Sequence, residues 1–230
     1  SSRLPVTAVA AIIQHNTSGI ISLKDSGITS PKGMEGHSYA TWDMPIEQAI
    51  IKKVVTDDGG DYSKINLIST SVEDIKAALS SNIDSVWIYY AWDGIACELQ
   101  GLDTNFFYFK DYSPELDDYS PVIIANNDFL KNNSEVAKKF MAALSKGYDY
   151  AIENPDDAAQ ILVDANEGLD IELCKKSQNW LASQYKADAD KWGVIDQKRW
   201  DAFYGWVYDN GLCEIDIPDG FGFSNDYLPE

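Results

Sequence analysis

The sequence predicts an α/β fold in its first half and a region of helices in its second half. Up to about residue 126, short apolar runs rich in Val, Ile and aromatic residues alternate with longer segments of helical period. This alternation is typical of a sheet covered by helices. Beyond Asn126 only helical periods remain, so the second half supplies helices without strands of its own to pack against.

The predicted strands are short runs of β-branched and aromatic residues. They are VTAVAAII (6–13), HSYAT (37–41), INLIS (65–69), SVWIYY (85–90), NFFYF (105–109) and PVIIAN (121–126). Between them lie three segments with the periodicity of helices, at 45–55, 71–80 and 92–100, and Ser71 with Asp74 forms a capping box in the second. We expect the strands to form a single sheet and the helices to cross over it.

The helices of the second half are predicted at roughly 128–153, 155–166, 170–185 and 196–210. Asn154 and Pro155 mark a helix start, and Asn210 with Gly211 marks a stop. The last helix carries an apolar stripe made of Trp200, Phe203, Tyr204, Val207 and Tyr208. Because a large exposed apolar patch is unusual on a monomer, we expect a sheet, another helix or a second copy of the chain to cover this stripe.

Composition and charge exclude several classes of function. The formal net charge of −19, from 18 Lys and Arg against 37 Asp and Glu, disfavours nucleic acid and anionic membranes as partners. Three scattered cysteines and two histidines lack the spacing of a metal site. The sequence has no Walker-type loop, no G-x-G-x-x-G and no G-x-S-x-G. We therefore expect no metal, no cofactor and no catalytic residue.

The run DSVWIYYAWDG (84–94) holds the first candidate binding site. Tyr90 and Trp92 fall where a strand ends and a helix begins, and open α/β sheets bind ligands at such ends. A tryptophan ring stacks on a flat ligand, and the carboxylate of Asp93 accepts hydrogen bonds from an amino group. The structural alternative is that the aromatic residues belong to the core and that Asp93 is a solvated acid at a helix start.

Two further segments that adjoin predicted strands are also candidate binding sites. TWDMPIEQ (41–48) places Trp42 and Asp43 in another strand-to-helix turn, where the alternative is an ordinary capped turn. QHNTSG (14–19) is a polar break after the first strand, and it brings His15 and Asn16 to a candidate hinge facing a cleft. A lone histidine beside a strand is more often structural than functional.

Several motifs taken in order resemble one family. They are AVAAIIQHNTSG, the W-x-x-P-I-E turn, DGGDYSKI, VWIYYAWDGI, KKFMAALSKGYDYAIENPDDAA and the terminal FSNDYLP. Together they resemble the thiamine-precursor-binding proteins of the NMT1/THI5-like family over nearly the whole chain. The resemblance implies the substrate-binding component of an ABC importer, with a fold like that of type II periplasmic binding proteins.

The resemblance also implies a domain organisation. Full-length relatives carry further strands and helices before the position of PVTAVAAIIQ. The chain would then hold one complete α/β lobe plus the C-terminal helices of a truncated first lobe. We expect residues 1–13 to be the hinge strand and a remnant of lobe 1, residues 14–124 to be lobe 2, and residues 125–230 to be the helical part of lobe 1.

By resemblance, the ligand is thiamine or its aminopyrimidine precursor, captured for import. The family's contacts fall on Trp92, Asp93, Tyr90 and Trp42. Relatives often have Glu at the position of Asp93, and G-W-G-S-P where this chain has T-W-D-M-P. The added carboxylate of Asp43 would suit a cationic ligand such as thiamine itself.

The implied partners are the permease and ATPase subunits of an importer. The implied location is outside the cytoplasm, with a lipoprotein anchor in a segment absent from this chain. A homo-oligomer of the truncated chain is a further expectation, because its last helix lacks the lobe that would cover it.

Two alternative functions remain open. Fungal members of the same family are enzymes that build the pyrimidine phosphate of thiamine from pyridoxal phosphate with iron, and they carry a Cys-Cys-Cys-Phe-Cys stretch. This chain has no clustered cysteines, which favours a binding protein. The remaining alternative is a non-catalytic α/β interaction module.

Overall fold

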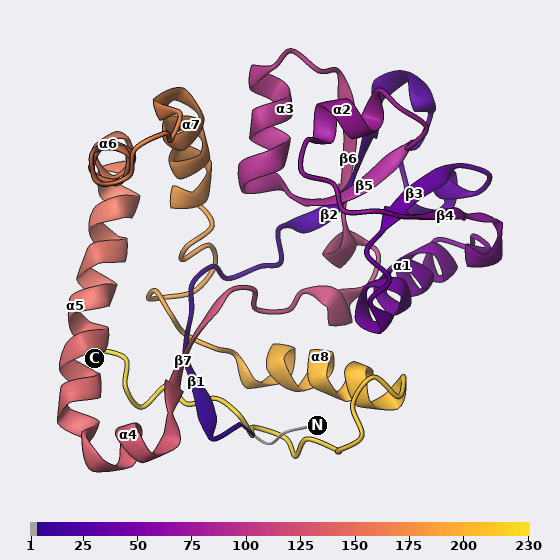
Figure 1. The fold of residues 1–230 in the computed structure, drawn as a ribbon. Coiled ribbons are helices and arrows are strands. Elements are labelled where there is room, and N and C mark those ends of the chain that lie inside the picture. Colours follow the sequence, from indigo (N-terminus) through magenta and orange to yellow (C-terminus); the bar gives the residue numbers. More distant parts are fainter. Residues whose placement is uncertain (1–3) are drawn as a thin grey trace. The chain divides into compact units, whose positions relative to one another are not determined.

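The computed structural model describes residues 4–230, which divide into two compact units (Figure 1). One unit is the continuous segment Thr17–Asp117. The other combines the residues up to Asn16 with Asp118–Glu230. The chain therefore crosses between the units at Asn16–Thr17 and at Asp117–Asp118, whereas the sequence suggested boundaries after residues 13 and 124.

The continuous unit is built on a five-stranded mixed sheet of order β4-β3-β5-β2-β6. The strands are β2 (Ser18–Leu23), β3 (Ser38–Thr41), β4 (Asn66–Ser69), β5 (Ser85–Tyr89) and β6 (Thr104–Tyr108). β3 runs parallel to β4 and β5, and β2 runs antiparallel to β5 and β6. The sequence did not predict β2, although it lies between two partners and is buried at every position except Leu23.

Helices cover both faces of this sheet (Figure 1). On one face, Ile21, Val86 and Ile88 form an apolar cluster with residues of α2 (Ile75–Leu79) and α3 (Ile95–Leu99). The opposite face receives α1 (Pro45–Asp57), whose apolar residues Ile51, Val54 and Val55 are fully buried. The three helices predicted between the strands are thus present, with α2 and α3 shorter than predicted.

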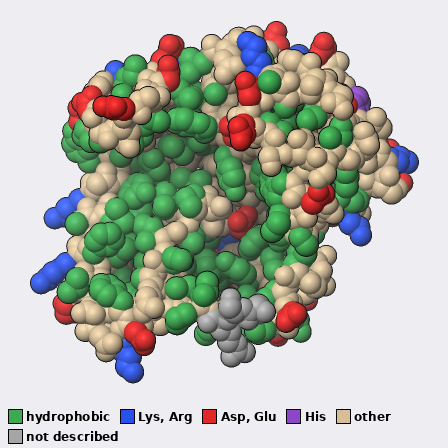
Figure 2. Space-filling model, viewed as in Figure 1, with side chains coloured by type: hydrophobic (Ala, Val, Ile, Leu, Met, Phe, Trp, Pro, Cys, Tyr) green, Lys and Arg blue, Asp and Glu red, His purple; other side chains and the backbone are tan. Residues whose placement is uncertain are grey.

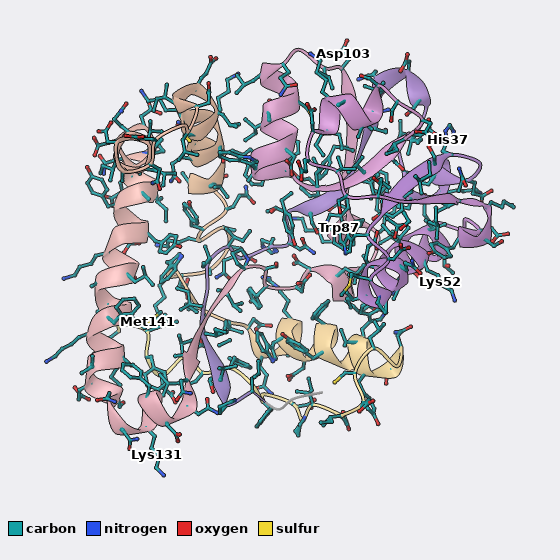
Figure 3. The ribbon with its side chains drawn as sticks, in the orientation of Figure 1. His37, Lys52, Trp87, Asp103, Lys131 and Met141 are labelled. Carbon is teal, nitrogen blue, oxygen red and sulfur yellow. The ribbon has the colours of Figure 1, made fainter. Side chains whose placement is uncertain are left out.

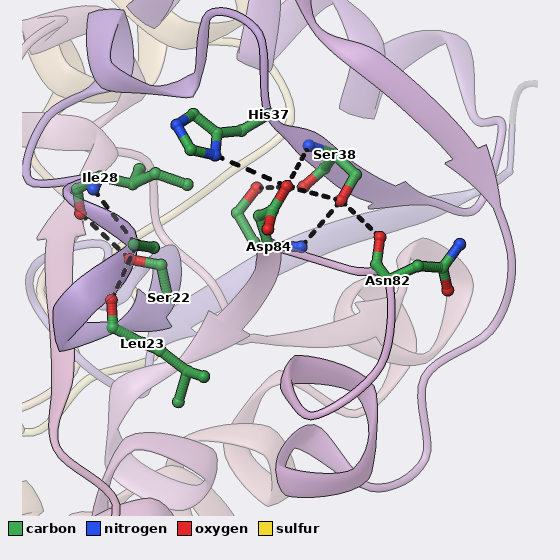
Figure 4. A network of polar contacts seen from close by, with 9 residues as sticks. Ser22, Leu23, Ile28, His37, Ser38, Asn82 and Asp84 are labelled. Carbon is green, nitrogen blue, oxygen red and sulfur yellow. Dashed lines mark hydrogen bonds and ion pairs between the residues drawn. The ribbon is translucent and has the colours of Figure 1, made fainter.

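A polar network holds the amino-terminal ends of β3 and β5 together (Figure 4). The carboxylate of Asp84 accepts hydrogen bonds from the backbone N–H of Ser38 at 2.7 Å and from its hydroxyl at 2.9 Å, and His37 lies 3.5 Å away. Burial alone raises the pKa of Asp84, but these donors and the His37 ring bring the pKa below its usual range. The parallel pair is therefore pinned at this end of the sheet.

The discontinuous unit contains an antiparallel pair and a set of helices. The pair is β1 (Val6–Ala11) and β7 (Val122–Asn126). The helices are α4 (Asn127–Asn132), α5 (Ser134–Glu153), α6 (Pro155–Ala165), α7 (Ile171–Ala182) and α8 (Gln197–Asp209). The prediction of a single sheet is wrong, because β1 and β7 pair with each other and form a separate sheet.

The core of this unit centres on Trp192, which is 1% exposed. Its ring stacks on Tyr148 with centroids 4.1 Å apart, and its Nε1–H donates to the carbonyl of Ile12 at 3.0 Å. Met141 of α5 (labelled in Figure 3) belongs to the same cluster as Val9 of β1. The long helix α5 is therefore attached to the strand pair through apolar contacts.

The predicted stripe on the last helix is covered only in part within its own unit, and Tyr208 at its end is 39% exposed. Trp200 is buried against Ala8, Tyr119 and Ile195, and its Nε1–H donates to the carbonyl of Phe221 at 2.9 Å. The rings of Phe203 and Tyr204, together with Val207, are half-buried.

Apolar surface remains open around β7. Ile124 is 58% exposed. A cavity of about 290 Å³ adjoins β7, α4 and α5, and another of about 230 Å³ adjoins β7 and α8; both are lined in part by Ile124. Hydrophobic side chains gather over this region in Figure 2. The strand pair thus presents an uncovered apolar edge.

We expect Gly19→Ala to destabilise the protein by about 1–3 kcal/mol or more, because the added methyl would overpack the centre of the sheet. A Cβ at Gly19 would lie 2.0 Å from the carbonyl oxygen of Phe107. Gly147→Ala is the matched control: it lies within α5 with open space around it, and alanine there should stabilise by about 0.5–1 kcal/mol. Urea unfolding of both variants measures the difference, and equal stabilities would contradict this account of β2.

Candidate functional site

The candidate site lies at one edge of the five-stranded sheet. β3, β4 and β5 are parallel, so their last residues, Thr41, Ser69 and Tyr89, end at the same edge. The turns that follow these strands carry Trp42 with Asp43 and the segment Tyr90–Gly94. Open α/β sheets bind ligands at such edges.

Trp42 stands at this edge with much of its ring open to solvent. It is 45% exposed, and its inner side packs on Trp87 of β5 with ring centroids 5.2 Å apart. Trp87, labelled in Figure 3, packs in turn against Phe109, with ring centroids 4.4 Å apart and ring planes at 67°. The rings of Trp87 and Phe109 therefore hold Trp42 in place on its inner side, and its outer face is available for stacking.

Asp43 follows in a left-handed backbone conformation, with φ of 58°. Its backbone N–H donates to the hydroxyl of Thr41 at 3.0 Å, and its carboxylate accepts a hydrogen bond from the hydroxyl of Ser69 at the end of β4. The amide of Gln48 lies 3.5 Å from the other carboxylate oxygen. These contacts tie the turn after β3 to the neighbouring strand and hold the carboxylate at the exposed edge.

Glu47 supports the same turn from inside. Its carboxylate is completely buried and accepts hydrogen bonds from Tyr39 at 2.6 Å and from Thr41 at 2.8 Å. Burial and the acceptor Glu47 raise the pKa of Tyr39, which keeps the phenol protonated as a donor. The sequence analysis did not single out Glu47 or Ser69, although Glu47 closes the W-x-x-P-I-E motif.

The second wall of the edge is the π-helical turn Tyr90–Gly94. Trp92 is 43% exposed. The carboxylate of Asp93 is partly buried and accepts the backbone N–H of Tyr89; burial raises the pKa of Asp93 above its usual value. Gly94 is buried, and a Cβ there would lie 2.7 Å from the Tyr90 ring. Glycine therefore lets this turn pack closely.

The side chain of Tyr90 packs against aromatic residues of β6. Its ring lies 5.1 Å from Phe106 and 6.2 Å from Tyr108, and its hydroxyl donates to Glu98 of α3. Burial, followed by the acceptor Glu98, raises the pKa of Tyr90. The structure thus places Tyr90 on the face covered by α3. Trp42, by contrast, packs on Trp87, and residue 87 lies on the opposite face in the strand register. Tyr89, which the sequence analysis did not select, is 45% exposed at the same edge.

His15 and Asn16 lie in the discontinuous unit. His15 Nε2 is 3.0 Å from the carboxylate of Asp188, and the amide of Asn16 donates to Asp118 at 2.8 Å. Burial alone raises the pKa of Asp188, but His15 and the charge of Arg199 bring the pKa below its usual range. A polar cavity of about 380 Å³ adjoins this cluster, lined by residues that include Gln14, Tyr119, Asp188, Asp190, Asp196 and Arg199. The structure therefore assigns both residues to a polar cluster of their own unit.

Within residues 4–230, no group of three or more His, Cys, Asp or Glu side chains is arranged to hold a metal ion. Across the same residues, every helix is too short or too polar to span a bilayer.

Comparison with known proteins identifies the relatives of this chain. A family model described as NMT1/THI5 like matches residues 1–158. The chain is 27% identical over 213 residues to the formylaminopyrimidine-binding protein of Halalkalibacterium halodurans, an alignment that covers 90% of this chain and 64% of that protein. The chain therefore spans slightly less than two thirds of this relative's length.

An enzyme and a transport protein also resemble the chain. It is 26% identical over 193 residues to the 4-amino-5-hydroxymethyl-2-methylpyrimidine phosphate synthase THI5 of Saccharomyces cerevisiae, covering 75% of this chain and 53% of the enzyme. The structure of the periplasmic sulfonate-binding protein SsuA from Methylobacillus flagellatus superposes with a TM-score of 0.67 at 16% identity, covering 96% of this chain and 67% of that one. This likeness confirms the predicted fold class, α/β and like that of type II periplasmic binding proteins.

We expect Asp93→Asn to make the protein more stable at pH 7. Burial raises the folded-state pKa of Asp93 above that of the unfolded chain, so the folded state binds the proton more tightly. The contribution of Asp93 to the free energy of unfolding is therefore fully present below its pKa in the unfolded chain, about 3.9. This contribution is lost as the pH rises through its higher pKa in the folded protein. The advantage of the variant should therefore disappear at acid pH.

Thermal unfolding of the two proteins across the acid range measures this effect. Asp103→Asn, at an exposed position before β6, is the control and should show no such pH-dependent gain. A variant at position 93 that is less stable than the natural protein at pH 7 would contradict the interpretation.

Proposed function

Because the chain belongs to the NMT1/THI5-like family, we propose that it is the solute-binding component of an ABC importer and captures thiamine or its aminopyrimidine precursor. The observation that carries this proposal is the sheet edge with Trp42 and Trp92 exposed beside Asp43 and Asp93. Aromatic faces stack on a pyrimidine ring, and carboxylates accept hydrogen bonds from its amino group. The relative from Halalkalibacterium halodurans, named for binding a formylaminopyrimidine, supports the same ligand class.

The site residues form two proposed groups. Trp92, Asp93, Trp42 and Asp43 would contact the ligand directly, and Tyr90 would hold the turn that carries Trp92. His15 and Asn16, in the discontinuous unit, remain proposed contacts from the first lobe. In this proposal, ligand is captured by closure of two lobes and then delivered to a permease.

The proposed partners and location follow from this role. The periplasmic sulfonate-binding protein that shares the fold is described as belonging to an ABC transporter. By the same role, this chain would work outside the cytoplasm with permease and ATPase subunits, and we propose a lipoprotein anchor. We also propose that Thr17–Asp117 corresponds to the second lobe, and that the helices after residue 125, with β1, belong to the first.

The alternative function is an enzyme of thiamine biosynthesis. The yeast relative is a pyrimidine phosphate synthase, so the family includes enzymes. In this chain Cys97 and Cys174 are buried and far apart in sequence, and burial raises the pKa of Cys97 to about 11. A thiol of this kind stays protonated near neutral pH, which favours binding over cysteine-based chemistry. A non-catalytic interaction module is the third candidate.

We expect Trp92→Ala and Asp93→Asn each to weaken binding of thiamine or its aminopyrimidine by the natural full-length protein. A hydrogen bond to a charged group contributes about 1.5–3 kcal/mol, so Asp93→Asn should reduce affinity about tenfold to a hundredfold. Isothermal titration calorimetry measures the effect, with circular dichroism to verify the fold. Unchanged affinity in Asp93→Asn would mean that Asp93 is a structural acid at a helix start and does not contact the ligand. Formation of a pyrimidine product with pyridoxal phosphate and iron would favour the enzyme.

We also expect the 230-residue chain to self-associate. The exposed edge of β7, with Ile124 58% exposed and apolar cavities adjoining it, supports this expectation. Ile124→Lys should return the chain to a monomer, because a charge on an edge strand opposes pairing. Light scattering across a concentration series measures the mass. A monomer at high concentration in the unaltered chain would refute this expectation.

A further inference from the structure

We infer that the sheet edge selects ligands whose planar ring carries a positive charge, and that Asp43 is the specificity-determining residue. This inference rests on the proposed function, because it concerns the same site. It goes further by fixing the charge of the ligand, which separates a cationic heteroaromatic ring from a neutral aminopyrimidine of similar shape.

The charges at the edge have one sign. The last residue of β3, β4 and β5 and the segment that follows each one, residues 41–47, 69–74 and 89–98, contain no Lys, Arg or His. They contain six acidic residues: Asp43, Glu47, Glu73, Asp74, Asp93 and Glu98. At the end of β6, Lys110 lies over the Tyr108 ring at 5.0 Å. Tyr108 shares its face with Ile88, which α3 covers, rather than with Trp87.

Most of these acids are already engaged by neutral donors. Glu47 accepts from Tyr39 and Thr41, Glu98 accepts from Tyr90, and Asp74 caps α2 through the N–H of Ala77. Asp43 is also engaged, by Ser69 and Gln48, but it is exposed and follows directly after Trp42, which is 45% exposed. Its carboxylate is therefore fixed in place, open to solvent and next in the chain to a ring on which a ligand can stack.

The backbone holds Asp43 at a cost. A positive φ disfavours residues with a side chain, and here the conformation is stabilised by the hydrogen bonds from Asp43 N–H to Thr41 and from Ser69 to the carboxylate. Glycine would adopt this turn without strain. The carboxylate is thus held in place before ligand arrives, which reduces the entropy lost on binding.

A cation suits this arrangement for two physical reasons. The faces of Trp42 and Trp92 are electron-rich and attract a positive charge. A neutral ring stacked over Asp43 would remove water from the carboxylate without replacing its interactions, which costs free energy. A ring cation replaces that water with an opposite charge, so the same contact becomes favourable.

The test compares two ligands of the same shape and different charge. Isothermal titration of the natural full-length protein would use thiamine, whose thiazolium ring is a permanent cation, and its neutral analogue with thiophene in place of thiazolium. We expect thiamine to bind at least tenfold more tightly. Asp43→Asn tolerates the same backbone and keeps an acceptor for Ser69, so it should weaken thiamine about tenfold to a hundredfold and leave the analogue within about threefold.

Two further variants make the result decisive. Asp43→Gly relieves the backbone and removes the carboxylate, so it should reproduce the loss for thiamine if Asp43→Asn folds poorly. Asp103→Asn removes the same charge before β6, at the end of the sheet opposite Tyr108 (Figure 3), and should change neither affinity. Equal binding of the two ligands, or a preference that persists in both Asp43 variants, would overturn the inference and leave the proposed function standing. Binding of neither ligand, nor of the aminopyrimidine, would instead contradict the proposed function.

Discussion

The buried carboxylate of Glu47 fixes the part of the molecule on which the candidate site depends. A carboxylate without solvent needs donors to compensate for lost hydration, and Tyr39 and Thr41 of β3 supply them. Glu47 belongs to the first turn of α1, so one side chain joins the strand, the turn and the helix. Trp42 and Asp43 lie within this closed segment. The positions of Trp42 and Asp43 therefore depend on the hydrogen bonds of Glu47, in which neither residue takes part.

The opposite end of the same strand is held by a second carboxylate. Asp84 binds the backbone and hydroxyl of Ser38 where β3 begins, so β3 is anchored at both ends to neighbouring elements. Between these anchors, Tyr39 and Ala40 are almost fully buried. The unit therefore presents the residues of the sheet edge on a strand held at both ends, and the proposed discrimination between ligands by Asp43 needs such a support.

The sequence predicted which segments form helices and strands better than it predicted which strands pair with each other. The runs around Val86 and Phe107 predicted β5 and β6 because apolar, β-branched and aromatic residues fill a strand covered on both faces. β2 escaped prediction because Ser18 and Gly19 belong to the segment interpreted as a polar break, while their burial arises from neighbours distant in sequence. The strands β1 and β7 resemble the others in composition, and no local pattern reveals that they pair with each other in a sheet separate from the other five.

The candidate site was predictable to a similar extent. The exposure of Trp42 and Trp92 followed from their places after strands, since the polarity of a parallel sheet brings such turns to one edge. Tyr90 lies on the same face as Val86 and Ile88, and strand alternation alone does not show that α3 covers it there or that Glu98 accepts its hydroxyl. The left-handed backbone of Asp43 could not be predicted either, because this conformation is usually indicated by a glycine and the chain has an aspartate there.

One feature of β1 bears on how the chain is synthesised. β1 pairs with β7 on one side, and on the other it bonds to Gly222 and Ser224, near the last residue of the chain. The segment Thr17–Asp117 can fold as soon as it leaves the ribosome, because its contacts lie within one continuous stretch. β1 cannot complete its pairing until residues 122–126 and 222–224 have also been synthesised. The discontinuous unit therefore reaches its final structure later than Thr17–Asp117, because its first strand depends on partners more distant in the sequence.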